Sequence, residues 1–241
     1  MLLIGRSTRL SRYVTGLEKT YMATARLGAV SDTLDADGEV TGLDTPLPSE
    51  NTIREALPSF TGDILQVPPM VSALKREGER LYELHRKGIT VEREARPVTV
   101  HRFALTTFDP ADNTASFEIS CSSGTYVRTL IADLAERAGS GAYLTALRRT
   151  TVGHLTIQDA LSPETLTPES LYNHIIQPAE VVGHLPGRVV SGANRDSVCH
   201  GGRMESRGVE GSYRVMCGNE LLAVYRDEGE EGRAEVVLCA G

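Results

Sequence analysis

The sequence lacks the usual signs of a metal-binding or disulfide-stabilised protein. It has only four cysteines, Cys121, Cys199, Cys217 and Cys239, and none of them forms a CxxC pair. This spacing argues against a zinc site and a disulfide framework, and it suggests a reducing cytosol. The six histidines are scattered as well, without an HxH or HxxxH pair. We therefore expect no bound metal.

Motifs that bind phosphates or carry a nucleophile are absent too. The sequence contains no P-loop, no GxGxxG and no GxSxG, so nothing in it indicates an NTPase, a dinucleotide-binding enzyme or an α/β-hydrolase. No apolar run reaches the roughly 18 residues of a membrane-spanning helix. The first ten residues also lack the basic region and long apolar stretch of a signal peptide. We expect a soluble, cytoplasmic protein without a cofactor.

The charge is distributed unevenly along the chain. A net charge of −7 does not by itself indicate a nucleic-acid binder. However, residues 1–30 hold five basic residues and one acidic residue, and residues 64–103 hold eight and five, whereas residues 31–63 hold one and eight. A basic face on an acidic protein could still contact phosphates. Ordinary variation of surface charge is the alternative explanation.

Hydrophobic periodicity predicts a hairpin followed by a helix. The stretches "RPVTVHRFALTTF" and "TASFEISCS" read as two strands joined by a turn at residues 109–113. After them, apolar residues recur with helical spacing over residues 127–138, and Gly139 ends the pattern. Residues 21–27 alternate as a strand does, and "YLTALRRTTVGHL" predicts a short helical turn followed by a strand.

These elements predict an α+β protein of two domains. We expect residues 1–166 to form the first domain, with a mixed, largely antiparallel sheet and flanking helices. Residues 167–180 are rich in Pro, Thr, Ser and Glu and read as a linker. Residues 181–241 contain short apolar stretches separated by glycines, which predicts a small β-barrel.

Five blocks of sequence, in this order and spacing, carry a resemblance to a known family: "EKTYMATARLG", "SDTLDADGEV", "VPPMVSALKREGERLYELHRKGI", "REARPVTV" and "CSSGTYVRTLIADLAERAGSGAYLTALRRTTVG". They resemble the bacterial tRNA pseudouridine synthase B family. The resemblance runs from about Leu3 to Leu166 and implies that residues 1–166 are the family's catalytic domain, incomplete at its N-terminus. Residues 181–241 are similar to the family's PUA-like RNA-binding tail. It implies a monomeric isomerase that converts a uridine in the T-arm loop of tRNA, at position 55, to pseudouridine without a metal or cofactor.

The resemblance assigns three catalytic residues. Tyr21 matches the tyrosine that lies against the target base, and an aromatic ring can stack on a base that has left its own stack. Asp35 matches an aspartate close to the active site that matters for turnover, and Arg128 matches the arginine that pairs with the catalytic aspartate. From the residues alone, Tyr21 could instead pack in a core, and "SDTLDADG" could be an Asp-rich turn.

Five further residues match positions that bind the RNA. Tyr126 matches a tyrosine that contacts the substrate, and Leu147 matches an apolar residue of the uracil pocket. Lys75 and Arg76 match a segment that contacts RNA, and Arg148, with its neighbour Arg149, would add contacts to the RNA backbone. The alternatives are core packing for Leu147 and a solvated helix face for Lys75 and Arg76.

The family's nucleophilic aspartate has no counterpart in this sequence. In the family it lies in a Gly-Thr-Leu-Asp-Pro loop just before the residues that match Leu2 and Leu3, whereas the first aspartate here is Asp32. We expect Arg128 to lack its intended carboxylate and the 241-residue chain to be inactive. The chain would be a truncated form of a normal enzyme or, alternatively, a protein of the same family that binds or folds tRNA without modifying it.

Overall fold

The computed structural model describes residues 1–76 and 78–239, and for Lys75 and Arg76 it describes only the backbone. The chain divides into two compact units. The larger is Leu17–Ile157, and the smaller combines Met1–Gly16 with Gln158–Gly241. The first sixteen residues thus belong to the smaller unit, whereas the sequence analysis grouped them with residues up to 166. In the described part of the chain, no helix is long and apolar enough to cross a membrane.

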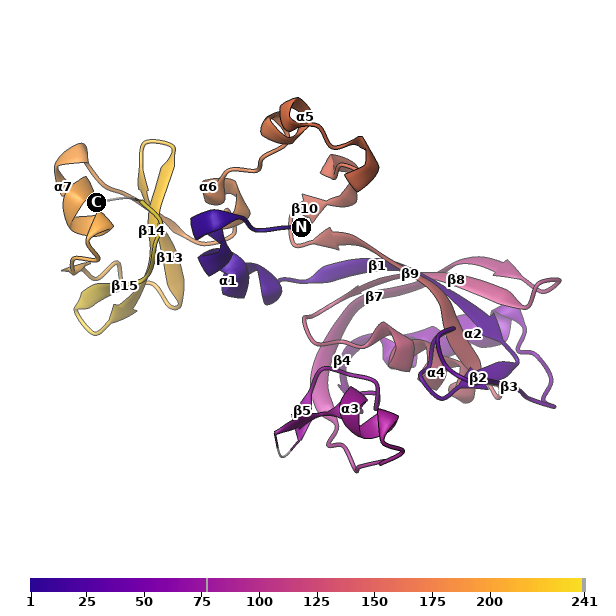
Figure 1. Cartoon of the computed structure of the whole chain (residues 1–241). Coiled ribbons are helices and arrows are strands. Elements are labelled where there is room, and N and C mark those ends of the chain that lie inside the picture. Colours follow the sequence, from indigo (N-terminus) through magenta and orange to yellow (C-terminus); the bar gives the residue numbers. More distant parts are fainter. Residues whose placement is uncertain (77, 240–241) are drawn as a thin grey trace. The chain divides into compact units, whose positions relative to one another are not determined.

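A six-stranded sheet forms the larger unit, with the strand order β10-β9-β1-β8-β7-β4 (Figure 1). All neighbouring strands in it are antiparallel, which confirms the largely antiparallel sheet that we expected but not its mixed character. The hairpin predicted around residues 109–113 is confirmed as the pair β7–β8. The strands are β1 (Lys19–Leu27), β4 (Gly62–Gln66), β7 (Arg96–Asp109), β8 (Thr114–Cys121), β9 (Ala142–Val152) and β10 (Leu155–Thr156).

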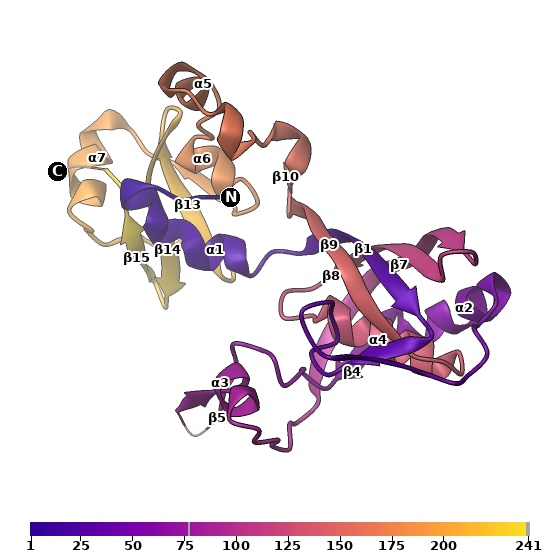
Figure 2. The same cartoon turned by 45° about the vertical axis from the view of Figure 1, so that its right-hand side comes forward.

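Helices α4 (Val127–Arg137) and α2 (Glu50–Ala56) lie against one face of this sheet, as both views show (Figures 1 and 2). The predicted helical spacing of α4 is confirmed, because Leu130, Ile131 and Leu134 are buried against the strands. Alternate residues of β8 point into the same core. The 3-10 helix η2 (Leu57–Phe60) continues α2 and also packs into it.

Segment 142–152 is strand β9 throughout, so the helical turn predicted at its start is wrong. β9 pairs with β1 along the whole of β1, with two register shifts. This pairing outweighs the local helical preference of "TALRR", because strand formation depends on neighbouring strands more than on local propensity.

Two small hairpins flank the sheet. Strands β2 (Ala29–Ser31) and β3 (Val40–Gly42) close the Asp-rich loop between them. Strands β5 (Lys75–Arg76) and β6 (Glu79–Arg80), with helix α3 (Leu81–Arg86), belong to the long connection from β4 to β7. This connection has its own small core, made by Met70, Leu74, Leu81, Leu84 and Val91.

A five-stranded sheet, with the order β11-β13-β14-β15-β12, forms the smaller unit. Its strands are β11 (Gly187–Val189), β12 (Met204–Glu205), β13 (Ser212–Cys217), β14 (Glu220–Glu228) and β15 (Glu231–Val237). The accompanying helices are η1 (Gly5–Leu10), α1 (Ser11–Thr15), η3 (Ile157–Asp159), η4 (Pro163–Thr165), α5 (Pro168–Asn173), α6 (Pro178–Val181) and α7 (Gly192–Cys199). The N-terminal segment packs here because Leu10 is fully buried among Val182, Leu221 and Val236.

Polar contacts reinforce the attachment of the N-terminal segment. Arg6, Arg9 and Arg12 each donate a hydrogen bond to a backbone carbonyl at residues 235–238, at distances of 3.1–3.2 Å. The Tyr13 hydroxyl donates to the Glu235 carboxylate at 2.9 Å. These contacts join η1 and α1 to strand β15.

The smaller unit contains a disulfide between Cys199 and Cys239, so the expectation of a protein without disulfides is wrong. The two residues are 40 positions apart, but the end of α7 lies beside the segment that follows β15, and their Cα atoms are 5.5 Å apart. Cys121 and Cys217 are free thiols. The spacing of cysteines along the sequence contained no sign of this proximity.

Candidate active site

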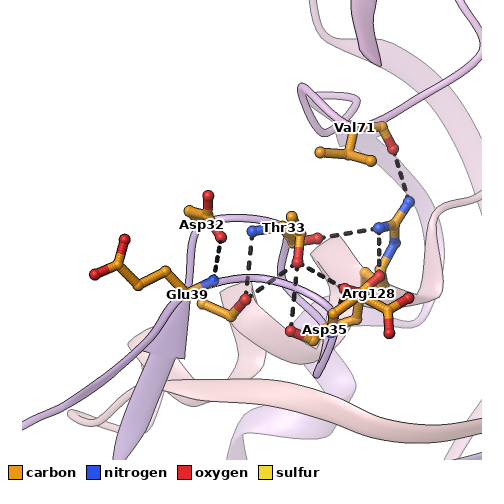
Figure 3. A network of polar contacts seen from close by, with 8 residues as sticks. Asp32, Thr33, Asp35, Glu39, Val71 and Arg128 are labelled. Atoms are coloured by element: carbon orange, nitrogen blue, oxygen red, sulfur yellow. Dashed lines mark hydrogen bonds and ion pairs between the residues drawn. The ribbon is translucent and has the colours of Figure 1, made fainter. Parts of the chain in front are cut away.

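Arg128 lies in the first turn of α4 and connects three segments of the larger unit. Its Nη1 donates to the Asp35 carboxylate at 2.5 Å and to the Thr33 carbonyl at 3.1 Å, and its Nη2 donates to the Val71 carbonyl at 2.7 Å (Figure 3). An arginine is unfavourable near a helix N-terminus, where the helix dipole favours negative charge. The Asp35 carboxylate and the carbonyls of Thr33 and Val71 offset this unfavourable interaction with the helix dipole.

The partner of Arg128 is therefore Asp35, and the expectation that no carboxylate of this chain would meet the arginine is wrong. The two side chains are only 21% and 25% exposed, so the ion pair is mostly shielded from solvent. Asp35 lies 93 residues before Arg128 and meets it because the β2–β3 hairpin carries the loop toward α4. The family resemblance pointed instead to a carboxylate outside the sequence.

Hydrogen bonds within the Asp-rich loop fix the Asp35 carboxylate. Its Oδ1 accepts the Thr33 hydroxyl at 2.6 Å and the backbone N–H of Asp37 at 3.2 Å. Asp32 accepts the N–H of Glu39 at 2.8 Å and so closes the loop (Figure 3). The interpretation of these residues as a structural Asp-rich turn therefore also holds, since aspartates accept backbone bonds here.

This environment lowers the pKa of Asp35. Burial alone would raise the pKa of the carboxyl group, but the hydrogen bond from Thr33, the positive charge of Arg128 and the N–H of Asp37 outweigh that effect. Asp35 therefore remains ionised, and both of its oxygens are already engaged. This carboxylate is suited to holding Arg128 and poorly suited to acting as a nucleophile.

Tyr21 and Leu147 lie on the strand pair β1–β9. Tyr21 is half-buried against the main core and pairs with Ile119 of β8 on one side and with Arg149 of β9 on the other. Burial raises the pKa of its phenol, while the neighbouring Arg149 guanidinium opposes this rise. Leu147 pairs with Ala23 and is 48% exposed, so this side chain is available to a ligand.

The two arginines of "LRR" lie on opposite faces of the sheet. Arg149 pairs with Tyr21, whereas Arg148 pairs with Met22, and successive side chains of a strand point to opposite faces. Arg149 thus shares a face with Tyr21 and Leu147, and Arg148 does not. The sequence motif gave no means of separating the two arginines, because strand register decides which one faces Tyr21.

The remaining predicted site residues are Tyr126, Lys75 and Arg76. Tyr126 immediately precedes α4 and is half-buried. Cys121, at the end of β8, is buried and pairs with Lys19 of β1. Lys75 and Arg76 form β5, and their side chains lie outside the described part of the structure.

The family of this chain follows from its similarity to known proteins. Residues 1–127 match the family model described as "TruB family pseudouridylate synthase (N terminal domain)". The tRNA pseudouridine synthase B of Azoarcus sp. (strain BH72) is 37% identical over 227 residues, which cover 92% of this chain and 75% of that protein. The chain belongs to the TruB family of pseudouridylate synthases.

Other TruB relatives match more closely over shorter regions. The tRNA pseudouridine synthase B of Heliobacterium modesticaldum is 43% identical over 80% of this chain and 63% of its own length. That of Burkholderia mallei (strain NCTC 10247) is 48% identical over 68% of this chain and 54% of its own length. The TruB chain thus spans about half to three quarters of the length of these relatives.

Solved structures support the fold of this TruB chain. The crystal structure of a Cbf5-Nop10-Gar1 complex matches with a TM-score of 0.72 at 20% identity, covering 98% of this chain and 71% of that one. An H/ACA RNP bound to a substrate RNA containing 2'-deoxyuridine matches with a TM-score of 0.70 at 17% identity, covering 97% and 70%. At this identity the likeness concerns the fold alone.

Proposed function

We propose that this chain supplies the RNA-binding face and most of the active site of a cytoplasmic tRNA pseudouridine synthase that acts on the uridine at position 55 of the T-arm loop. The observation that carries the proposal is the Arg128–Asp35 ion pair in a chain of the TruB family. In this role Tyr21 stacks on the base, Leu147 and Tyr126 line the base pocket, and Arg149 neutralises a nearby phosphate. Lys75, Arg76 and Arg148 contact the RNA more peripherally.

Arg128 would orient the nucleophilic aspartate that the family resemblance implies. The described contacts use three of the five N–H donors of its guanidinium group. Two donors therefore remain for a second carboxylate, and a guanidinium fork binds carboxylates well. Asp35 would hold Arg128 in this orientation and would not itself attack the sugar.

A restored aspartate loop provides the test. The 241-residue chain should release no tritium from tRNA labelled at C5 of uridine, since it has no aspartate before Asp32. The chain extended at its N-terminus by a relative's segment with the Gly-Thr-Leu-Asp-Pro loop should release tritium. The same extension with that aspartate changed to asparagine is the control. Turnover by the 241-residue chain at ordinary enzyme concentration, or none by the extended chain, would contradict the proposal.

A tRNA-binding or tRNA-folding protein without isomerase activity is the second candidate. The engagement of both Asp35 oxygens favours it for the 241 residues by themselves, because no other carboxylate in the described site is positioned to replace the nucleophile. This candidate predicts binding of a T-arm stem-loop that weakens steeply with salt but yields no product. Filter binding at several salt concentrations, combined with product analysis, distinguishes the two functions.

A further inference from the structure

Gln66 pairs with the main chain of Tyr126 through both ends of its side-chain amide. Its Nε2 donates to the Tyr126 carbonyl at 3.1 Å, and its Oε1 accepts the Tyr126 N–H at 2.7 Å. The side chain is 3% exposed. The reversed amide would place donor against donor and acceptor against acceptor, so this orientation is the only one that satisfies all four groups.

Other hydrogen bonds also hold the segment before α4. Thr125 donates through its N–H and its hydroxyl to the Ser122 carbonyl, and the Tyr126 carbonyl accepts the N–H of Leu130 as well as the Gln66 amide. Tyr126 is extended, with φ −98° and ψ 104°, and its side chain does not cap the helix start. Gly124, two residues earlier, has φ +89°, a left-handed conformation that glycine adopts readily. Between a left-handed glycine and a helix start without a side-chain cap, the Gln66 amide is the acceptor that the structure gives for the Tyr126 N–H.

The position of Gln66 on the edge strand β4 explains why it can reach this site. It is the last residue of β4, and Val67-Pro68-Pro69 follow, so the chain leaves the sheet at this point. Five residues after Gln66, the Val71 carbonyl accepts from Arg128. One short connection therefore holds both Tyr126 and Arg128.

We propose that Gln66 is a positioning residue that fixes Tyr126, and through it the base-contacting surface of the site. The bracing follows from the contacts themselves, whereas its role in binding the base rests on the proposed function of the chain. A fixed tyrosine loses less conformational freedom when a base binds, so loss of the brace should weaken the part of RNA affinity that depends on the target base.

Gln66→Met tests the bracing directly, since methionine has a similar length and no amide. We expect the Tyr126 N–H to exchange with deuterium about tenfold faster, as expected for loss of about 1.4 kcal/mol of local hydrogen bonding. Ser72→Ala is the matched control, because Ser72 is buried in the same connection and its hydroxyl has no hydrogen-bond partner among the described residues. If Q66M fails to fold, Gln66→Leu, which also lacks both the amide donor and the amide acceptor, replaces it. Unchanged exchange at Tyr126 would overturn the proposal.

Binding experiments then test the effect on the site. The dissociation constant is measured for a T-arm stem-loop with the target uridine and for the same stem-loop without that base. The dissociation constant without the base, divided by that with the base, should fall about tenfold in Q66M, as expected for lost hydrogen bonds to Tyr126. This ratio should not change further when Q66M is added to Tyr126→Ala. Additive effects would overturn positioning through Tyr126. If the unaltered chain does not bind the stem-loop at all, the proposed function fails, while the exchange experiment still decides the bracing.

Discussion

Replacing Asp35 with asparagine should destabilise the larger unit by about 2 kcal/mol. Removing one partner of a fully buried ion pair costs about 3–5 kcal/mol, whereas an exposed pair contributes about 0–1 kcal/mol. Arg128 and Asp35 are 21% and 25% exposed, which places this pair between the two cases. The asparagine side chain would keep the shape of the carboxylate, and Arg128 would keep its two carbonyl acceptors. The loss of stability should therefore stay below that of a fully buried ion pair.

Thermal unfolding measures this loss. For a domain of this size about 2 kcal/mol corresponds to a Tm lower by roughly 4–8 °C. Asp37→Asn is the matched control, because Asp37 lies in the same loop with an exposed side chain, and it should change stability by less than about 0.5 kcal/mol. Equal Tm values for D35N and D37N would refute the assigned role of the ion pair.

The pH dependence gives an independent check. The pKa of Asp35 is lowered in the folded state, so its contribution to stability is complete above the ordinary pKa of about 3.8 and is lost as the pH falls through the lowered value. The stability difference between the unaltered chain and D35N should therefore be constant near neutral pH and disappear in strong acid. A difference that persists in strong acid would show that charge is not its cause.

Three further predictions concern the smaller unit. Tyr13→Phe should lower its stability by about 1 kcal/mol and make the N-terminal segment more sensitive to limited proteolysis, because the hydrogen bond to Glu235 is lost. Reduction of the Cys199–Cys239 disulfide should lower the stability by about 3–4 kcal/mol, as expected for a loop of 40 residues, and calorimetry with and without reductant measures it. Asp227 accepts three consecutive backbone N–H groups, and its pKa is lowered to about 2, so NMR shifts of these groups should hold down to about pH 3 and change below it. For Tyr13→Phe, an N-terminal segment that proteases cleave as readily in the unaltered chain would contradict the prediction. Equal unfolding transitions with and without reductant would contradict the second prediction, and amide shifts that already change near pH 4 would contradict the third.

Local periodicity predicted the elements that depend on neighbours in sequence. Helix α4 follows from apolar residues spaced by three and four, and the β7–β8 hairpin follows from alternation around a short turn. Contacts between distant segments could not be predicted in this way. Strand β9 became a strand because it pairs with β1, more than a hundred residues earlier.

The candidate site shows the same division. The family resemblance assigned Tyr21, Asp35 and Arg128 to the predicted site, but it did not reveal that Asp35 and Arg128 meet. The register of β9 against β1 decides that Arg149 and not Arg148 shares the face of Tyr21. Gln66 gave no signal at all, because a single glutamine at a strand end has no pattern that distinguishes it from a surface residue.

The smaller unit combines two segments that lie far apart in the sequence, and this affects the order in which the protein folds during synthesis. Arg6 bonds to the carbonyl of Leu238, so the segment Met1–Gly16 cannot complete its packing until residue 238 has left the ribosome. At translation rates of about 5–20 residues per second, the buried face of this segment waits roughly 11 to 45 seconds for strand β15. The larger unit is continuous in sequence and can fold during that interval. The apolar side chain of Leu10 stays exposed during that interval, until Val182, Leu221 and Val236 are available to cover it.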